Sequence, residues 1–285
     1  MSHIHWYPGH IAKAERKLKE QLSLVDVVIE VLDARIPYSS IYPDIKKLLG
    51  DIPRLIILNK SDLADEAKTK NWIRELKEKT SHVVIASSSH RGNDYNSIMN
   101  KLIELGKPKM LKLMKKGLLP RPVRVMVVGM PNVGKSSIIN KLIKKTKTKT
   151  GAKAGVTRMQ QWVRVNPRID LLDTPGIIPL KLDNQQIAQK LAFVNSVSEN
   201  AYQNEEIANE LLQILNKKYK KELYEYYKLD ETKDATLENI ALARNWIVSG
   251  GEADITRTAA YVLKDFRDGK SGKFTLDDIT DYQYE

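Results

Sequence analysis

The sequence predicts an α/β protein, with about six mostly parallel strands over residues 1–180 and a small all-helical domain over residues 181–285. Two observations support this prediction. In the first part, apolar runs of strand length alternate with helix-like segments, a spacing that implies right-handed crossovers and a parallel sheet. After about Leu180 the strand pattern stops and only helix-like segments follow. We therefore expect a domain boundary near residues 178–184.

Four apolar runs and the helices around them make up most of the first part. Nearly continuous apolar runs are typical of parallel strands that are buried on both faces. The expected order is a basic amphipathic helix at Ala12–Val25, a strand in Val25–Arg35, a strand at Arg54–Lys60, a helix at Glu66–Thr80, a strand at His82–Ser88, a helix with a basic tail at Asn96–Gly117, and a strand at Pro122–Gly129.

Two further regions complete the predicted secondary structure. Met159–Gly176 predicts a hairpin-like pair of strands, with a turn around Asn166 and Pro167. The second part holds four helix-like segments, at residues 184–197, 204–229, 236–248 and 254–266. These segments lack strand-like runs between them, so we expect this domain to be all-helical.

Composition narrows the class of protein. Of the 285 residues, 42% are apolar, which is enough to bury a sizeable core, and there is no cysteine for a disulfide or a thiolate metal site. The N-terminus has no uninterrupted apolar stretch typical of a secretory signal, and no segment approaches the roughly 20 apolar residues of a membrane span. We expect a soluble cytoplasmic protein.

The charge is unevenly distributed along the chain. The net charge is +12, but residues 1–180 hold 33 Lys+Arg against 16 Asp+Glu, whereas residues 181–285 hold 14 against 19. Basic residues are dense in Lys107–Arg124 and in Lys141–Arg158, where seven occur without an acid. Such asymmetry suggests that the first part faces a polyanion.

A phosphate-binding loop follows the fourth predicted strand. The pattern Gly129-x-x-x-x-Gly134-Lys135-Ser136 lets backbone N–H groups wrap around phosphates without a Cβ clash, at the N-terminus of the next helix. Lys135 is expected to reach the β- and γ-phosphates, and Ser136 to bind Mg²⁺. The residues expected to contact nucleotide here are Asn132, Val133, Gly134, Lys135, Ser136 and Ser137.

Two downstream segments have the pattern of nucleotide switches. Asp173-Thr174-Pro175-Gly176 follows a predicted strand, so Asp173 is expected to hold Mg²⁺ through a water and the Gly176 N–H to meet the γ-phosphate. Thr157, in the preceding segment, is the best candidate for the threonine that binds Mg²⁺ only when a γ-phosphate is present. Thr146, Thr148 and Thr150 remain alternatives.

The stretch Asn59-Lys60-Ser61-Asp62 predicts guanine recognition. The Asp62 carboxylate only accepts hydrogen bonds, and guanine offers it two donors that adenine lacks. Asn59 is expected to hold the loop and Lys60 to stack over the base. The loop after the next strand is expected to give a backbone N–H to the guanine O6, from Ser87 or Ser88.

The order of these motifs is a circular permutation of the usual GTPase order, because the base loop precedes the phosphate loop. Both motifs follow predicted strands, so neither is accidental. Permutation preserves a site if a linker joins the old termini, and Leu105–Pro122 can serve as that linker. The fold expected is therefore a circularly permuted P-loop GTPase domain. The permutation places the C-terminal end of this domain just after the second switch.

Motifs along essentially the whole chain resemble circularly permuted GTPases of the YlqF type. They are HWYPGHIAKA (5–14), LDARIPYSS (32–40), LNKSDLA (58–64), GMPNVGKSSIIN (129–140), GVTRMQQW (155–162) and LLDTPGI (171–177). The resemblance implies a GTPase that uses GTP/GDP and Mg²⁺ and assists late assembly of the large ribosomal subunit. Its expected partners are that subunit and its rRNA, with no membrane or DNA, and we expect a monomer away from the ribosome.

The resemblance also raises two catalytic hypotheses. Ile177 occupies the position where Ras-like enzymes carry the glutamine that orients water, so another group must do this. His10 is the best substitute in the sequence, although an ordinary surface or structural histidine is the alternative. Related GTPases use an asparagine at the position of Asn132 to help bind K⁺, the alternative being a loop-capping role.

Three functions are compatible with these patterns. The first is a GTP-hydrolysing assembly factor that binds rRNA. The second is a regulatory GTPase that switches a protein effector without touching RNA. The third is an RNA-binding protein that scarcely turns GTP over. The basic residues within the first predicted switch favour RNA contact coupled to nucleotide state, and the missing glutamine predicts slow turnover without a partner.

Overall fold

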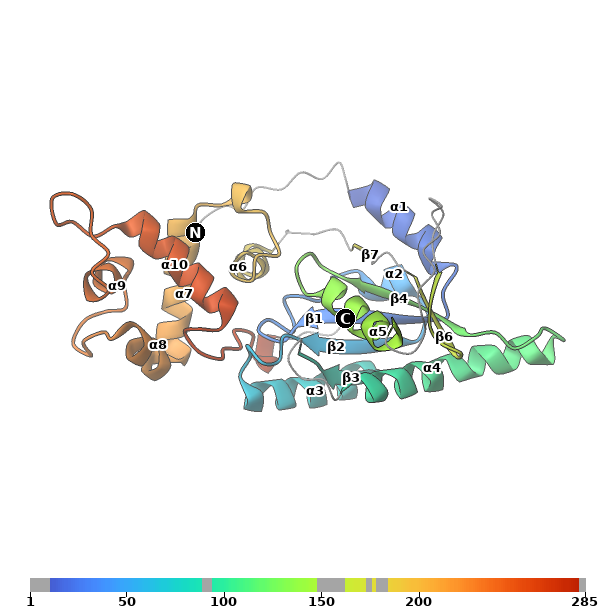
Figure 1. The fold of residues 1–285 in the computed structure, drawn as a ribbon. Helices are drawn as coiled ribbons and strands as arrows, with labels where there is room; N and C mark the ends of the chain where they lie inside the picture. The colour runs from blue at the N-terminus through green and yellow to red at the C-terminus, as the bar shows by residue number, and fades with distance from the viewer. Residues whose placement is uncertain (1–10, 89–93, 148–161, 173–175, 178–183, 282–285) are drawn as a thin grey trace.

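The computed structural model describes residues 11–88, 94–147, 162–172, 176–177 and 184–281. Figure 1 shows a sheet covered by helices and, beside it, a group of helices formed by the second part of the chain. The predicted boundary near 178–184 lies almost entirely outside the described residues, so the division into two domains stays a prediction.

The sheet confirms the predicted α/β architecture. Its strand order is β3-β2-β1-β4-β6-β5, and a short β7 also pairs with β4. All pairs are parallel except β5–β6, which form the predicted hairpin. The strands are β1 (Val27–Asp33), β2 (Arg54–Asn59), β3 (Val83–Ala86), β4 (Val123–Gly129), β5 (Trp162–Asn166), β6 (Ile169–Leu172) and β7 (Gly176–Ile177).

Helices cover both faces of this sheet. Ile56 and Leu58 of β2 pack with α3 in one apolar cluster, whereas Leu55 and Ile57 belong to the larger cluster that includes residues of α4. Since successive side chains of a strand point to opposite faces, α3 and α4 cover opposite faces of β2. The helices are α1 (Ile11–Leu22), α2 (Ile45–Leu49), α3 (Glu66–Thr80), α4 (Tyr95–Lys115) and α5 (Lys135–Lys147).

Helix α4 is longer than the sequence predicted. The expected basic tail is helical as far as Lys115, with Pro108 inside the helix. Gly106 is not a terminator here: it packs against β4 so closely that an added Cβ would lie 2.5 Å from Val123 Cγ1. Helix-favouring Leu, Met and Lys residues continue the helix past the proline. In Figure 1 the end of α4 extends beyond the sheet.

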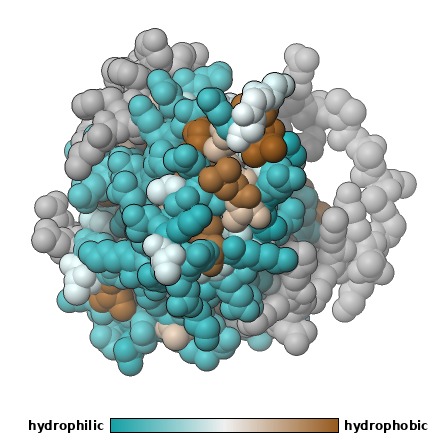
Figure 2. Space-filling model, turned by 90° about the vertical axis from the view of Figure 1, so that its left-hand side faces the viewer, coloured by the Kyte–Doolittle hydropathy of each residue, from teal (hydrophilic) through white to brown (hydrophobic). Residues whose placement is uncertain are grey.

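The second part of the chain is helical, as predicted, and buried apolar residues from each of its described α-helices belong to the same apolar cluster as those of the sheet. The helices are α6 (Gln185–Phe193), α7 (Asn204–Lys218), α8 (Lys220–Tyr227), α9 (Leu237–Ala243) and α10 (Ile255–Asp268). The view onto these helices is largely hydrophilic with a few apolar patches (Figure 2). Within the residues that the structure describes, no helix is long and apolar enough to cross a membrane.

The segment after α10 returns to the sheet. Leu276 N donates to Arg35 O (2.8 Å), and Phe274 N donates to Leu63 O (3.1 Å). Asp277 is fully buried and accepts hydrogen bonds from Ser39 and from Lys190 of α6. The returning segment therefore joins the helices to the loops that follow β1 and β2.

Candidate nucleotide-binding site

Those predicted site residues that the structure describes gather at one edge of the sheet. Strands β1, β2 and β4 are parallel and end at Asp33, Asn59 and Gly129, and Ser87 follows the end of β3. Ligands of open α/β sheets bind outside the carboxyl ends of the strands. Fold topology thus brings the base loop and the phosphate loop together, although the chain separates them.

The phosphate loop has the backbone shape that its glycines predict. Gly134 has φ +96°, and Asn132 between the glycines has φ +57°. A Cβ on Gly134 would lie 2.1 Å from Asn59 Nδ2, and one on Gly129 would lie 2.6 Å from Val31 O. Both positions are therefore closed to other residues, and the loop leads directly into α5 at Lys135.

Lys135 is held within this loop. Its side chain is buried, and Nζ donates to Met130 O at 2.6 Å. Burial lowers the pKa of Lys135 to about 8. The negative charge of a phosphate group at the loop would stabilise this buried ammonium, which fits the predicted role of Lys135 at the β- and γ-phosphates.

The base loop is bound directly to the phosphate loop. Asn59 Nδ2 donates to Val133 O at 2.9 Å, and this hydrogen bond joins the base loop to the phosphate loop. Lys60 Nζ donates to Asn132 O at 2.6 Å and forms an ion pair with Asp33 Oδ2 at 2.9 Å. Asp62 lies in the turn that follows β2. The contacts of Asn59 and Lys60 fix the base loop against the phosphate loop.

The loop after β3 is tied to the same assembly. Ser87 and Ser88 are buried, and Ser61 N donates to Ser87 O at 3.1 Å. Lys141 of α5 donates to Ser88 O at 2.9 Å and forms an ion pair with Asp94, which also accepts from Ser87 Oγ. The sequence reasoning missed Lys141 and Asp94, because neither belongs to a recognised motif.

Several predicted site residues lie outside the described part of the chain, namely His10, Thr157 and Asp173. Gly176 is described through its backbone: β7 pairs it with Val128, directly before the phosphate loop. Ser136 and Ser137 are exposed in the first turn of α5. Of the proposed Mg²⁺ ligands only Ser136 is described, and the described residues hold no cluster of three His, Asp or Glu side chains.

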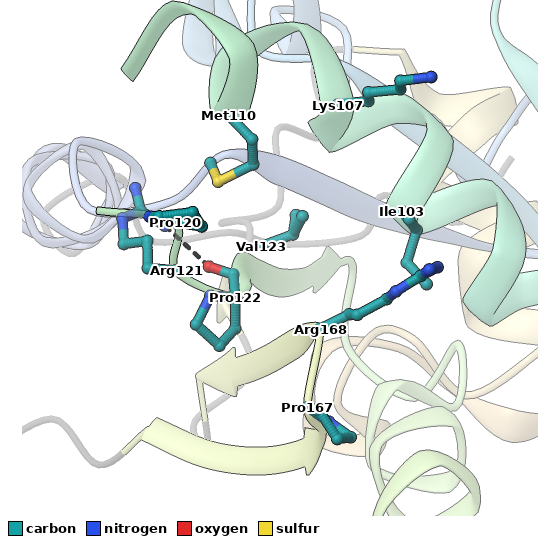
Figure 3. Close-up of a pocket in the computed structure, with 9 residues that line it drawn as sticks. All are labelled: Ile103, Lys107, Met110, Pro120, Arg121, Pro122, Val123, Pro167 and Arg168. Carbon is teal, nitrogen blue, oxygen red and sulfur yellow. Dashed lines mark hydrogen bonds between the residues drawn. The ribbon is translucent and has the colours of Figure 1, made fainter. Parts of the chain in front are cut away.

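A separate pocket of about 300 Å³ lies at the other end of β4 (Figure 3). Val123, where β4 begins, lines it together with Met110 of α4 and Arg168 of the β5–β6 turn. Because β4 runs from Val123 to the phosphate loop at Gly129, this pocket is at the opposite edge of the sheet from the nucleotide motifs. It is not the nucleotide site.

The geometry defines a class of protein. A phosphate loop after a parallel strand, with an Asn-Lys-x-Asp loop at the same edge of the sheet packed on it, is the site of a P-loop GTPase. Because the base loop comes first in the chain, the GTPase is circularly permuted.

Comparisons with known proteins identify the family. Residues 124–242 match the family model described as 50S ribosome-binding GTPase. The chain is 41% identical over 277 residues to ribosome biogenesis GTPase A of Bacillus cereus, covering 96% of this chain and 93% of that protein. The relative of the same name in Bacillus licheniformis is 38% identical, covering 96% of this chain and 98% of that protein.

A solved structure leads to the same conclusion. The GNP-bound YlqF from T. maritima superposes with a TM-score of 0.66 at 28% identity, covering 94% of this chain and 98% of that one. The chain belongs to the ribosome biogenesis GTPase A family and is a GTPase involved in ribosome biogenesis. The family implies GTP and GDP as ligands, typically with Mg²⁺.

Proposed function

We propose that this GTPase binds the rRNA of a large ribosomal subunit precursor in the cytoplasm and couples GTP hydrolysis to a late step of its maturation. The observation that carries the proposal is the basic surface of the GTPase domain, in a chain whose matching family model is named for 50S ribosome binding. Proteins that bind nucleic acids draw much of their affinity from contacts between basic side chains and phosphates.

Within this proposal the nucleotide is held by the assembled loops. Asn59 fixes the base loop, Lys60 stacks over guanine and Asp62 selects it, while Ser87 or Ser88 offers a backbone N–H. The positive φ of Gly134 and the buried Lys135 make the phosphate loop fit a phosphate chain with its metal ion.

Metal binding would draw on residues of three segments. Ser136, Thr157 and Asp173 would hold Mg²⁺, which would supply charge neutralisation at the phosphates. Asn132 donates through Nδ2 to Asn195 O, which leaves its Oδ1 for a K⁺ ion. His10 is the proposed group that orients the attacking water, because Ile177 cannot.

The end of α4 is one candidate RNA contact. Lys112, Lys115 and Lys116 are exposed there, and no ion pair to any of them occurs among the described residues. Lys109 and Arg121, by contrast, are both paired with Asp26. Apart from Lys107, which is exposed beside the pocket at the start of β4, the positive charge of α4 that is available to a partner therefore lies at the helix end that projects beyond the sheet.

A salt titration tests this surface. Replacing Lys112, Lys115 and Lys116 by Ala should weaken binding to purified large subunits and flatten the log–log salt dependence by about two units, because each phosphate contact contributes about 0.7–0.9. GTP affinity should stay unchanged. A second variant, with Ala at Lys144, Lys145 and Lys147, tests the lysines at the end of α5 in the same way.

The matched control lies in the helical domain. Lys217, Lys220 and Lys221 are exposed on α7 and α8, whereas the neighbouring Lys218 holds Leu276 O at 2.6 Å and must be kept. Ala at the first three positions should leave the salt slope unchanged. If only this variant changes the slope, the RNA contact lies on the helical domain instead.

A regulatory switch that acts on a protein effector without RNA is the alternative function. Cosedimentation with large subunits in GDP, GTP and a non-hydrolysable analogue separates the two, together with GTP turnover measured with and without subunits. The assembly factor should bind in a nucleotide-dependent manner and turn GTP over faster on subunits. Absence of both effects over a range of KCl would favour the switch.

A further inference from the structure

A buried charged cluster connects the base loop to the helical domain. Asp33, the last residue of β1, is fully buried and binds Arg35 through two side-chain contacts, from Nε at 2.9 Å and from Nη2 at 2.8 Å. The same carboxylate holds Lys60 Nζ at 2.9 Å. These two cations keep the pKa of Asp33 well below its usual range despite burial.

The position of Lys60 depends on this carboxylate. Lys60 has a left-handed backbone, with φ +58°, and its ammonium contacts Asp33 and Asn132 O. One end of the side chain is thus fixed by the phosphate loop and by Asp33, which leaves the methylene stem as the surface on which a base can stack.

Arg35 extends the cluster to the helical domain. The guanidinium is 1% exposed, and its Nη1 donates to Arg267 O at 3.3 Å and to Phe266 O at 3.4 Å. Both carbonyls belong to the last turn of α10, where a cation is favoured by the helix dipole. The guanidinium also lies over the Phe266 ring, 5.2 Å from its centre.

We propose that Asp33 is a positioning residue for nucleotide binding that holds Lys60 against the phosphate loop, and that Arg35 makes this hold depend on the docking of α10. The inference rests on the proposed contact of Lys60 with the base. A displacement of α10 would remove two acceptors from Arg35, loosen its grip on Asp33 and so release Lys60. Undocking of the helical domain would thereby weaken nucleotide binding.

The neighbouring strands provide a matched control. Glu30 of β1 and Arg54 of β2 form a second buried ion pair, at 3.0 Å, with exposures of 2% and 6%. Glu30 is the central residue of β1, three residues before Asp33, so this pair lies away from the carboxyl edge. It shares the burial and chemistry of the Asp33–Arg35 pair but not the contact with the base loop.

The experiment measures the affinity of a fluorescent GDP analogue and the stability to urea for Asp33→Asn, Lys60→Ala, their double mutant and Glu30→Gln. Asp33→Asn should weaken GDP binding about 10-fold or more, the usual effect of losing a hydrogen bond to a charged group. Glu30→Gln should leave the affinity within about two-fold while losing stability. The double mutant should bind no more weakly than Lys60→Ala, because both changes remove one interaction.

The outcomes test the base contact of Lys60 and the positioning role of Asp33 separately. If Lys60→Ala keeps wild-type affinity, the proposed base contact is wrong. If Lys60→Ala weakens binding but Asp33→Asn does not, or if the two effects add, Asp33 does not position Lys60. Should Asp33→Asn fail to fold, Asp33→Glu gives the same test, since its longer side chain displaces the carboxylate.

Hydrogen exchange tests the part played by Arg35. Saturating GDP should slow amide exchange at the end of α10 in the wild-type protein. Arg35→Lys keeps a charge beside Asp33 but cannot reach the carboxylate and the α10 carbonyls together, so this protection should be lost with GDP still bound. Protection that persists in Arg35→Lys would overturn the link to α10.

Discussion

Replacing Gly134 by Ala should abolish tight GDP binding without unfolding the protein. A Cβ at this position would lie 2.1 Å from Asn59 Nδ2, and the backbone has φ +96°, which a residue with a side chain rarely adopts. Asn59 is buried, so its amide has no free space to move into. The clash must therefore be relieved by a shift of the phosphate loop.

The size of the effect follows from two costs, the backbone strain of a non-glycine residue and one lost hydrogen bond. Holding a non-glycine residue in a sparsely populated backbone region costs about 1–3 kcal/mol. Losing the bond from Asn59 Nδ2 to Val133 O leaves a buried donor unpaired, which costs about 1–3 kcal/mol. The loop shape that binds nucleotide becomes less favourable by this total of about 2–6 kcal/mol. The affinity for GDP should therefore fall by about 30-fold or more.

Fluorescence titration with a GDP analogue, together with thermal denaturation, measures this outcome. Gly50→Ala is the control, because Gly50 also has positive φ (+54°) but has nothing within 4 Å of an added Cβ. It should lose a little stability and no affinity. GDP binding by Gly134→Ala within about three-fold of wild type would refute the assignment of this loop as the phosphate cradle.

Four further results are expected. Asp62→Asn should shift preference from guanosine to xanthosine nucleotides in a competition assay, and unchanged selectivity would remove Asp62 from base recognition. Replacing K⁺ by Na⁺ should slow GTP hydrolysis by the wild type but hardly affect Asn132→Ala; equal slowing of both would exclude Asn132 as a ligand. Near pH 8, calorimetry in two buffers should detect proton uptake on GDP binding, because the phosphates restore the charge of Lys135, whose pKa burial has lowered to about 8. Burial and the neighbouring Arg54 lower the pKa of His82 from 6.5 to about 4, so the unfolded chain binds more protons between these values. Stability to urea should therefore fall as the pH is lowered across that window, and less so in His82→Gln.

Periodicity predicted most of the fold because the parallel strands are continuous apolar runs. Helix α3 has the predicted bounds, and its start is marked by the Asp65 side chain, which accepts from Lys68 N. The end of α4 could not be predicted from propensity, because Gly106 and Pro108 are both unfavourable inside a helix. That glycine is instead required by close packing on Val123, a tertiary contact that local sequence does not reveal.

The part of the site that could be predicted is the part formed by motifs with a fixed geometry. Asn59 and Lys60 both contact the phosphate loop, whereas their predicted roles toward a bound base stay predictions. Asp33 and Arg35 were recognised only as part of a family motif, although an acid that ends a buried strand was a signal in itself. The contact of Asn132 with Asn195 could not be foreseen, because it joins two parts of the fold whose relative position depends on packing.

The predicted helical domain contacts both halves of the nucleotide site. Asn195 and Ser196, which follow α6, bind the phosphate loop at Asn132 and at Pro131 O, the latter at 2.7 Å. The segment after α10 binds Leu63 O, directly beyond the base loop. Binding free energies are reciprocal, so a partner that shifts this domain would change nucleotide affinity, and bound nucleotide would change partner affinity by the same factor. Circular permutation makes this arrangement available, because it frees the end of the second switch to lead into a new domain. A GTPase with the usual motif order continues from that point into its own sheet and would have to place such a domain elsewhere.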